Sequence, residues 1–261
     1  MRKVNQMSEI KAIFFDQDGV IVDTERDGHR VAFNETFRSF NYKFQWSVEE
    51  YHELLQIAGG KERMAHYLHT KGFNKSVSPS EEEQLIKEMH KVKTEKFIEL
   101  IESGKLPLRP GIKRLMKEAN QAGVFIGVCT TSDEKAAKAI AKLYLSDIHF
   151  GVFLAGDVVS KKKPDPEIYL LAMRKTGLKP ENCVVIEDSK NGLMAAKGAK
   201  MNVIVTTNPY TEKEDLDQAD IIITCLGDQE GDLGKLVKSN KPINFNGVLT
   251  LQQIKDYFSN H

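Results

Sequence analysis

Two carboxylates stand directly after the first apolar run of the sequence. Asp16 and Asp18 follow KAIFF (11–15), and Gly19 comes next. If 11–15 is a β-strand, the two-residue offset directs both carboxylates to the same side of the chain, and glycine then permits a sharp turn. Such a pair suits group transfer, because one carboxylate can act as a nucleophile while the other exchanges protons.

Other residues suited to chemistry stand at comparable points, after an apolar run or before a helical pattern. They are Thr130, Thr131 and Ser132 after 124–129, Lys163 before Pro164-Asp165-Pro166, and Glu187 and Asp188 after 183–186. In an open parallel sheet, ligands bind outside the carboxyl ends of the strands, so these side chains are expected at one edge. Hydroxyl and backbone N–H groups ahead of a helix also form a local anion site.

Four carboxylates at one edge require compensating positive charge. Lys163 supplies one charge, and a divalent cation would supply two. Oxygen ligands select hard cations, so Mg²⁺ is the expected cofactor. With both cations present, the site can accept a phosphate dianion. One carboxylate would then attack phosphorus while its neighbour exchanges protons with the leaving group and with water.

Each of these residues also has a simpler interpretation. Asp16 and Asp18 could form a solvated turn, Lys163 could belong to a solvated charge run, and Thr130 could cap a helix. Glu187 could contact the metal ligands without binding the metal itself. The occurrence of all four segments in order favours the chemical interpretation. Without the other three segments, a carboxylate pair at a sheet edge would have no positive charge to balance it.

The elements that must position these residues alternate between strand and helix patterns, which predicts an α/β fold with a parallel sheet and right-handed crossovers. The apolar runs do not alternate with polar residues, as is typical of strands covered on both faces. The predicted strands are 11–15, 124–129, 151–155, 183–186, 202–205 and 220–224; the predicted helices are 111–123, 133–145, 166–177 and 191–200.

An all-helical segment interrupts this pattern after the first strand. Its predicted helices are 27–40, 47–57, 61–71 and 81–103, the last with Ser80 as N-cap and Glu83 three residues further on. We therefore expect an α/β core of residues 1–24 and 105–261, a helical cap domain of residues 25–104, and hinges near Asp23 and Gly104. The segment after 207 predicts one strand and up to two helices, with no assigned function.

Composition narrows the class of partner. The chain has 261 residues, and 37 Lys and Arg balance 37 Asp and Glu, so no basic field favours nucleic acid or an anionic membrane. No run approaches the roughly 20 apolar residues that span a bilayer. Three cysteines in apolar runs suggest buried free thiols of a reducing compartment. We expect a monomer in the cytoplasm, or in a plastid stroma after removal of a transit peptide.

Four short motifs together resemble the haloacid dehalogenase (HAD) superfamily over about residues 11 to 206. They are DQDGV, the Thr130 of CTT, the Lys163 of KKPDP, and EDS at 187–189. The resemblance implies a Rossmann-like core with an inserted cap, in which Asp16 forms an aspartyl-phosphate and Asp18 is general acid and then base. It implies that Thr130 and Lys163 hold the phosphoryl group. It also implies that Asp16, the main-chain carbonyl of Asp18, and Asp188 bind Mg²⁺, with Glu187 acting directly or through water.

Two further segments, DTERDGHRVAFNETF and GGKERM (59–64), look like the CbbY-type phosphatases, which are similar to β-phosphoglucomutases in layout. That likeness implies hydrolysis of sugar phosphates, including xylulose-1,5-bisphosphate, a misfire product of Rubisco. Glu25 and His29 would line the substrate pocket. Gly60, Lys61 and Arg63 would bind the end of the substrate that is distant from the reacting phosphate, where the Arg63 guanidinium can donate two hydrogen bonds to a second phosphate. Thr131 and Ser132 are counted with the substrate-binding residues.

Other functions stay open at this point. The same phospho-enzyme could return its phosphate to the sugar, which would make the protein a phosphomutase. A phosphoglycolate phosphatase has the same type of cap, and a non-catalytic descendant would bind a ligand or partner only. His29 could be an ordinary helix-face residue, and Lys61 and Arg63 could be solvated. A one-phosphate substrate would leave these two cations without a partner, which favours a larger or doubly phosphorylated substrate. The expected substrate is a ketose bisphosphate.

Overall fold

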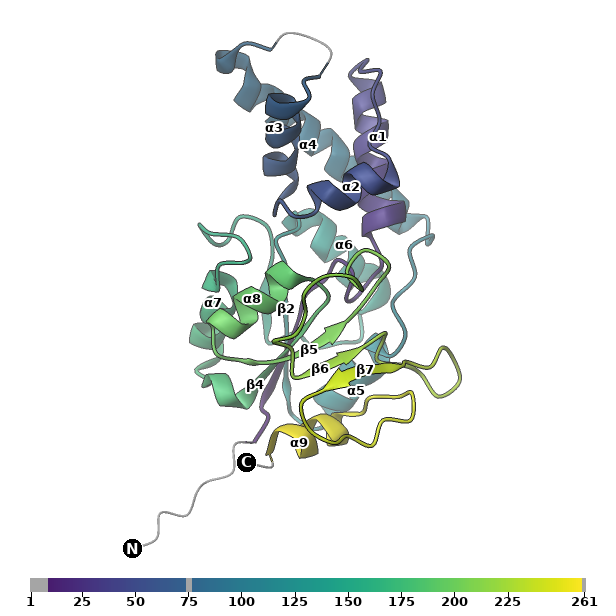
Figure 1. The fold of residues 1–261 in the computed structure, drawn as a ribbon, viewed down its shortest axis with the longest axis vertical. Helices are drawn as coiled ribbons and strands as arrows, with labels where there is room; N and C mark the ends of the chain where they lie inside the picture. The colour runs from purple at the N-terminus through teal and green to yellow at the C-terminus, as the bar shows by residue number, and fades with distance from the viewer. Residues whose placement is uncertain (1–8, 74–76, 260–261) are drawn as a thin grey trace, which may run out of the picture.

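A seven-stranded sheet forms the centre of the protein, whose computed structural model describes residues 9–73 and 77–259 (Figure 1). The strand order is β3-β2-β1-β4-β5-β6-β7, and all neighbours are parallel except β7, which runs antiparallel to β6. The strands are β1 (Ala12–Phe15), β2 (Phe125–Cys129), β3 (Val152–Leu154), β4 (Cys183–Glu187), β5 (Asn202–Thr206), β6 (Ile221–Ile223) and β7 (Leu236–Ser239). The predicted α/β fold with a mainly parallel sheet is confirmed.

Strand β1 lies at the point where the strand order reverses, between β2 and β4. Phe15 pairs with Val128 on one side and with Ile186 on the other, so the three strands end at nearly the same level. In open α/β sheets the crevice at such a reversal is where ligands bind. The residues that follow β1, β2 and β4 are therefore brought together.

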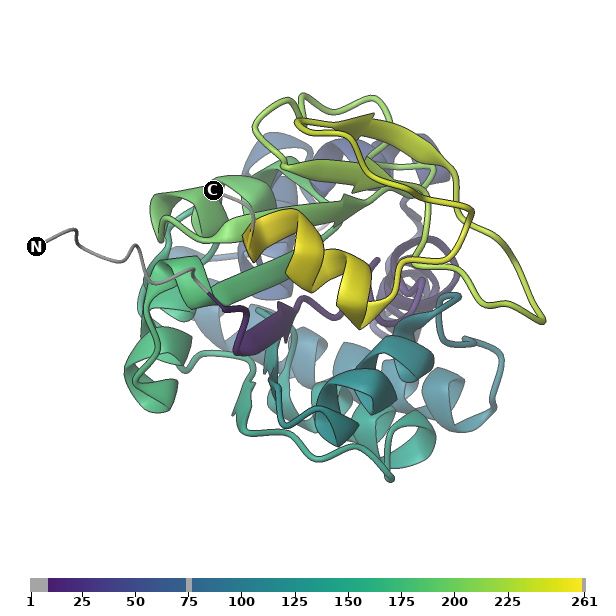
Figure 2. The same cartoon turned by 90° about the horizontal axis from the view of Figure 1, so that it is seen from below.

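Alternate strand residues form two separate cores, one on each face of the sheet. Ile13 and Phe15 face the core beneath α5 (Ile112–Gln121), α6 (Glu134–Tyr144) and α9 (Leu251–Ser259). Ala12 and Phe14 face the core beneath α7 (Glu167–Thr176) and α8 (Lys190–Gly198). Figure 2, in which the molecule is seen from below, shows α9 lying across the sheet. Burial on both faces explains why the strand sequences are apolar throughout.

Helices between Glu25 and Glu102 stand over one end of the sheet in Figure 1. They are a short π-helical turn (Glu25–His29), α1 (Arg30–Ser39), α2 (Val48–Leu54), α3 (Gly60–Thr70) and α4 (Pro79–Glu102). An aromatic core around Phe33, Phe37 and Trp46 lies among them, separate from the two sheet cores. A core of its own is what an inserted cap domain requires; the domain boundaries at 25 and 104 stay predictions.

Two local expectations were wrong. Helix α4 is capped by Ser78 and not by Ser80, because Pro79 occupies the first helical position, where its fixed φ fits, and Glu81 completes the capping box. Within the described residues, the segment after 207 contains one helix, α9, and a second strand, β7, that was not predicted. Residues 211–220 stay irregular. Just before them, Asn208 accepts hydrogen bonds from nearby backbone N–H groups, which competes with helix formation.

None of the helices in the described part of the chain combines the length and apolar character that a membrane span needs. The three cysteines, Cys129, Cys183 and Cys225, are buried free thiols, as predicted.

Candidate active site

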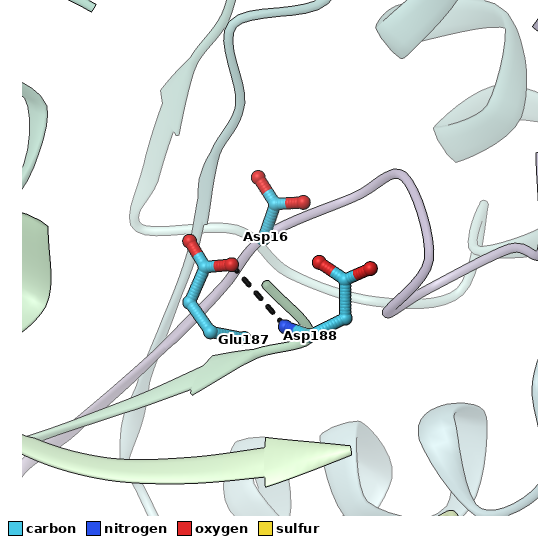
Figure 3. Close-up of side chains that lie close together, drawn as sticks. All are labelled: Asp16, Glu187 and Asp188. Carbon is cyan, nitrogen blue, oxygen red and sulfur yellow. Dashed lines mark hydrogen bonds between the residues drawn. The ribbon is translucent and has the colours of Figure 1, made fainter. Parts of the chain in front are cut away.

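Three buried carboxylates meet where β1 and β4 end. The backbone N–H of Asp16 donates to the carbonyl of Ile186 at 2.9 Å, which continues the strand pairing one residue past β1. This bond places Asp16 beside Glu187 and Asp188, and one oxygen of each carboxylate lies within 4.8 Å of the others (Figure 3). Oxygen ligands at such spacing fit a hard divalent cation.

Lys163 supplies the cation that the sequence predicted for this cluster. Its Nζ donates to Asp16 Oδ1 at 2.5 Å, to Glu187 Oε1 at 2.6 Å and to the carbonyl of Cys129 at 2.9 Å. The Tyr169 hydroxyl also donates to Glu187 Oε1, at 2.5 Å. All three ammonium protons are thus used, which ties the ends of β1, β2 and β4 to one side chain.

The cluster keeps more negative charge than Lys163 can balance. Burial raises the pKa of Asp16 well above its usual value, and the charges of Glu187 and Asp18 add to this, while Lys163 opposes it. Burial also raises the pKa of Asp188, with Glu187 and Asp16 as the next causes. Burial alone would lower the pKa of Lys163, but its two carboxylate partners outweigh burial and raise it. When all are ionised, two negative charges remain uncompensated, the number that a divalent cation carries.

Asp18 stands apart from this cluster and is held by different donors. Thr24 Oγ1 donates to Asp18 Oδ1 at 2.5 Å, His29 Nε2 lies 3.0 Å from the same oxygen, and Ser132 Oγ donates to Oδ2. Burial opposes ionisation of Asp18, but the interaction with His29 and the hydrogen bonds from Ser132 and Thr24 outweigh burial and hold the pKa of Asp18 below its usual range. The two aspartates of DQDG therefore have different environments, which suits a nucleophile and a separate proton carrier.

A cleft between the cap helices and the sheet encloses both aspartates. From the cap it is lined by Glu25, His29, Gly60 and Arg63. Glu25 Oε2 accepts from the Tyr51 hydroxyl at 2.6 Å, and Arg63 Nη1 donates to the same hydroxyl at 3.0 Å. Tyr51 thus fixes an acceptor and a cation side by side on the cap wall.

Comparison with known proteins decides the family. The model of the haloacid dehalogenase-like hydrolases matches residues 10–200. The chain belongs to this hydrolase family. HAD hydrolases generally use Mg²⁺, and the buried cluster of Asp16, Glu187 and Asp188 fits such an ion.

Relatives place the chain within the HAD hydrolases. A CBBY-like protein of Arabidopsis thaliana is 49% identical over 222 residues, which covers 83% of this chain and 69% of the relative. Protein CbbY of Cereibacter sphaeroides is 42% identical over 226 residues, 85% and 95% of the two chains. A crystal structure of a CbbY mutant from Rhodobacter sphaeroides, in complex with xylulose-(1,5)bisphosphate, has a TM-score of 0.77 at 41% identity and covers 83% of this chain and 94% of that one. The protein is a CbbY-like HAD phosphatase.

The predicted site residues of this HAD phosphatase lie together with one exception. The cleft is lined by Asp16, Asp18, Glu25, His29, Gly60, Arg63, Thr130, Thr131, Ser132, Lys163, Glu187 and Asp188. Lys61 is instead at an adjoining cavity, where its Nζ pairs with Asp157 Oδ2 of the core at 2.7 Å. The ion pair means that Lys61 already has a partner without any substrate.

Lys93 of α4 was not predicted as part of the site. Its Nζ lies 2.7 Å from His29 Nδ1, and because an ammonium can only donate, Nδ1 accepts and the ring proton sits on Nε2, facing Asp18. Burial lowers the pKa of Lys93 to about 8, against the opposing attraction of Asp18 and Glu25. Lys93 occurs among Ile86, Met89, Phe97 and Ile101 on the buried face of α4, and a lone lysine at helical spacing on an apolar face was the available signal.

Proposed function

We propose that the protein is a Mg²⁺-dependent phosphatase that hydrolyses a small sugar phosphate through an aspartyl-phosphate on Asp16, with a ketose bisphosphate such as xylulose-1,5-bisphosphate as its preferred substrate. The observation that supports the reaction best is the buried cluster of Asp16, Glu187 and Asp188 with Lys163, placed beside a separately held Asp18. The substrate class is supported by the CbbY relative in complex with xylulose-(1,5)bisphosphate.

The metal would be held by carboxylate oxygens of Asp16 and Asp188 and by the main-chain carbonyl of Asp18. Glu187 is better suited to act through water, because Oε1 already accepts from Lys163 and Tyr169, and Oε2 accepts from the Asp188 N–H at 3.2 Å. A bound Mg²⁺ would supply the positive charge that lets a phosphate dianion approach these carboxylates.

In the first step, an Asp16 oxygen attacks phosphorus while Lys163 holds Oδ1 in place. The bond between phosphorus and the sugar oxygen breaks, and Asp18 donates a proton to that oxygen. Like-charge repulsion from a phosphate dianion beside Asp18 would raise the pKa of Asp18, which favours the protonated form that this step needs.

In the second step, Asp18 removes a proton from water, and the resulting hydroxide attacks the phosphorus of the aspartyl-phosphate. Inorganic phosphate leaves and the Asp16 carboxylate is restored. The three donors that hold Asp18 in its charged form place it to accept that proton. The cap would keep other water away from the intermediate while the sugar is bound.

The reaction and the substrate class are tested together by phosphate release with Mg²⁺ across sugar mono- and bisphosphates. We expect kcat/KM for xylulose-1,5-bisphosphate to exceed that for pentose monophosphates by about tenfold or more, the effect of one additional charge-assisted contact. A preference for monophosphates would overturn the bisphosphate assignment. Conversion of hexose 1-phosphates to 6-phosphates without phosphate release would instead establish a mutase.

Of the two cations predicted to bind a second phosphate, Arg63 is the better placed, because it lines the cleft and Lys61 does not. Arg63→Ala is expected to lower kcat/KM for the bisphosphate about 10- to 100-fold, the worth of a hydrogen bond to a charged group. For monophosphates kcat/KM should change by no more than about threefold, because they have no second phosphate for the buried Arg63 guanidinium to contact.

The matched control for Arg63 is Lys61→Ala, which removes a cation from the same helix but outside the cleft. It should leave the ratio between bisphosphate and monophosphate unchanged. Because Arg63 also donates to the carbonyl of Ile57 at 3.2 Å, thermal unfolding must accompany the kinetics. Equal losses for both substrates in a folded Arg63→Ala enzyme would place Arg63 outside the distal phosphate site.

A further inference from the structure

The loop after β5 reaches the carboxylate cluster, although no sequence pattern assigned it a function. Asn208 is buried at the edge of the cleft, and its Nδ2 donates to Asp188 Oδ2 at 2.7 Å. Asp188 is the carboxylate of the cluster that Lys163 does not contact among the described hydrogen bonds. Asn208 is thus the neutral donor that holds this oxygen.

The orientation of the Asn208 amide follows from its other bonds. Its Oδ1 accepts from the backbone N–H of Tyr210 at 2.9 Å and of Thr211 at 3.2 Å. Only the oxygen of an amide can accept two N–H groups, so the nitrogen must face Asp188. The loop therefore fixes a donor, and not an acceptor, against the carboxylate.

Arg109, in the chain segment that returns from the cap, joins this loop to the turn after Asp18. Its guanidinium donates to the carbonyl of Thr207 at 2.7 Å, next to Asn208, and to the carbonyl of Gly19. It also donates to the carbonyl of Thr224 at 2.7 Å, at the end of β6. The rigid guanidinium of Arg109 thus holds three chain segments at fixed distances from one another.

Contact between these segments is tight. A Cβ atom on Gly19, which has φ +81°, would lie 2.1 Å from Asp188 Oδ2 and 2.9 Å from Asn208 Nδ2. No side chain fits there, so the turn, the amide and the carboxylate touch directly. A shift of the loop or of the turn would therefore move Asp188.

We propose that Asn208 is a positioning residue for the metal ligand Asp188, and that Arg109 maintains this contact by holding the loop and the turn together. The inference rests on the proposed Mg²⁺ function. With Oδ2 held by Asn208, the Asp188 carboxylate cannot rotate freely, and its other oxygen is presented to the cation. Partners of this kind typically change metal affinity or activity by about 10- to 100-fold when they are removed.

The test is calorimetric titration of the whole, substrate-free protein with Mg²⁺. Asn208→Ala is expected to raise the Mg²⁺ dissociation constant about 10- to 100-fold. In turnover, the Mg²⁺ concentration for half-activation should rise by the same factor, while kcat at saturating Mg²⁺ stays within about threefold, because a positioning residue does not touch the substrate. A purely structural role would lower the melting temperature without this separation.

Arg114 provides a matched control for Arg109. It also donates to backbone carbonyls of the C-terminal part of the chain, those of Leu226, Gly227 and Leu249, and among the described hydrogen bonds none joins it to the turn at Gly19 or to the loop at Asn208. Arg109→Lys and Arg114→Lys keep the positive charge but lose the planar guanidinium, which donates to several carbonyls at once. Both should lower the melting temperature, but only Arg109→Lys should weaken Mg²⁺ binding.

Unchanged Mg²⁺ affinity in a folded Asn208→Ala protein would overturn the inference and leave the proposed function intact. Equal weakening by Arg109→Lys and Arg114→Lys would overturn the role of Arg109. If the wild-type protein does not bind Mg²⁺, the proposed function fails, and the inference fails with it.

Discussion

Asp16→Asn is expected to lower phosphate release by about a millionfold, the scale on which removal of a covalent nucleophile acts. The amide has almost the same shape as the carboxylate, and its oxygen can still accept from Lys163, but it cannot form the acyl phosphate. Acid-quenched wild-type enzyme should carry phosphate on Asp16 during turnover, and the variant should carry none. Mass spectrometry of the quenched proteins, together with phosphate release, measures both.

The melting temperature of Asp16→Asn distinguishes loss of the nucleophile from unfolding of the protein. The pKa of Asp16 is raised in the folded protein, so between its unfolded and folded pKa values the folded state binds more protons, and wild-type stability falls as pH rises. Asp16→Asn removes that contribution and is expected to melt no lower than the wild type at neutral pH in a chelator. A melting temperature below that of the wild type would contradict this account of the cluster.

The control for Asp16→Asn is Asp147→Asn. Asp147 is an exposed partner of Lys113 and Lys117 outside the cleft, and its replacement should leave the rate near that of the wild type. Phosphate release by Asp16→Asn at more than a small fraction of the control rate would assign the nucleophile to another residue.

The fold followed from sequence wherever local pattern and burial agree. Strands such as 183–186 are apolar because both faces are covered, so pattern and environment carry the same information. Strand β7 escaped prediction because it is an edge strand whose Leu236 and Val237 are exposed, and its sequence has neither strand alternation nor a buried run. Its position depends on pairing with β6, which no local pattern encodes.

Some residues of the candidate site could be predicted from the sequence, and others could not. Asp16, Lys163 and Asp188 could be predicted because parallel strands bring their carboxyl ends together whatever the intervening sequence. Lys93 and Asn208 depend on single tertiary contacts, with His29 and Asp188, which are 64 and 20 residues away. Such contacts follow only after the cap and the loop after β5 have been placed.

Asp18→Ala is expected to slow hydrolysis of a sugar phosphate by about 10²- to 10⁴-fold, the usual contribution of a general acid and base. Both steps should suffer, because the sugar oxygen loses its proton donor and water loses its proton acceptor. An aryl phosphate separates the two steps, since a phenolate leaves without protonation. With it, phosphorylation of Asp16 should stay fast while hydrolysis of the intermediate is slow.

Asp18→Ala should therefore accumulate phospho-enzyme from the aryl phosphate and show a burst of the phenolate, followed by slow turnover. His29→Gln keeps the Asp18 carboxylate but removes the imidazole that Lys93 orients, so a smaller loss is expected, without the burst. If Asp18→Ala lost the same factor with sugar and aryl phosphates and accumulated no phospho-enzyme, the defect would lie in forming the intermediate. Asp18 would then act on Asp16 or on phosphate binding, and the proton carrier would have to be another residue of the cleft.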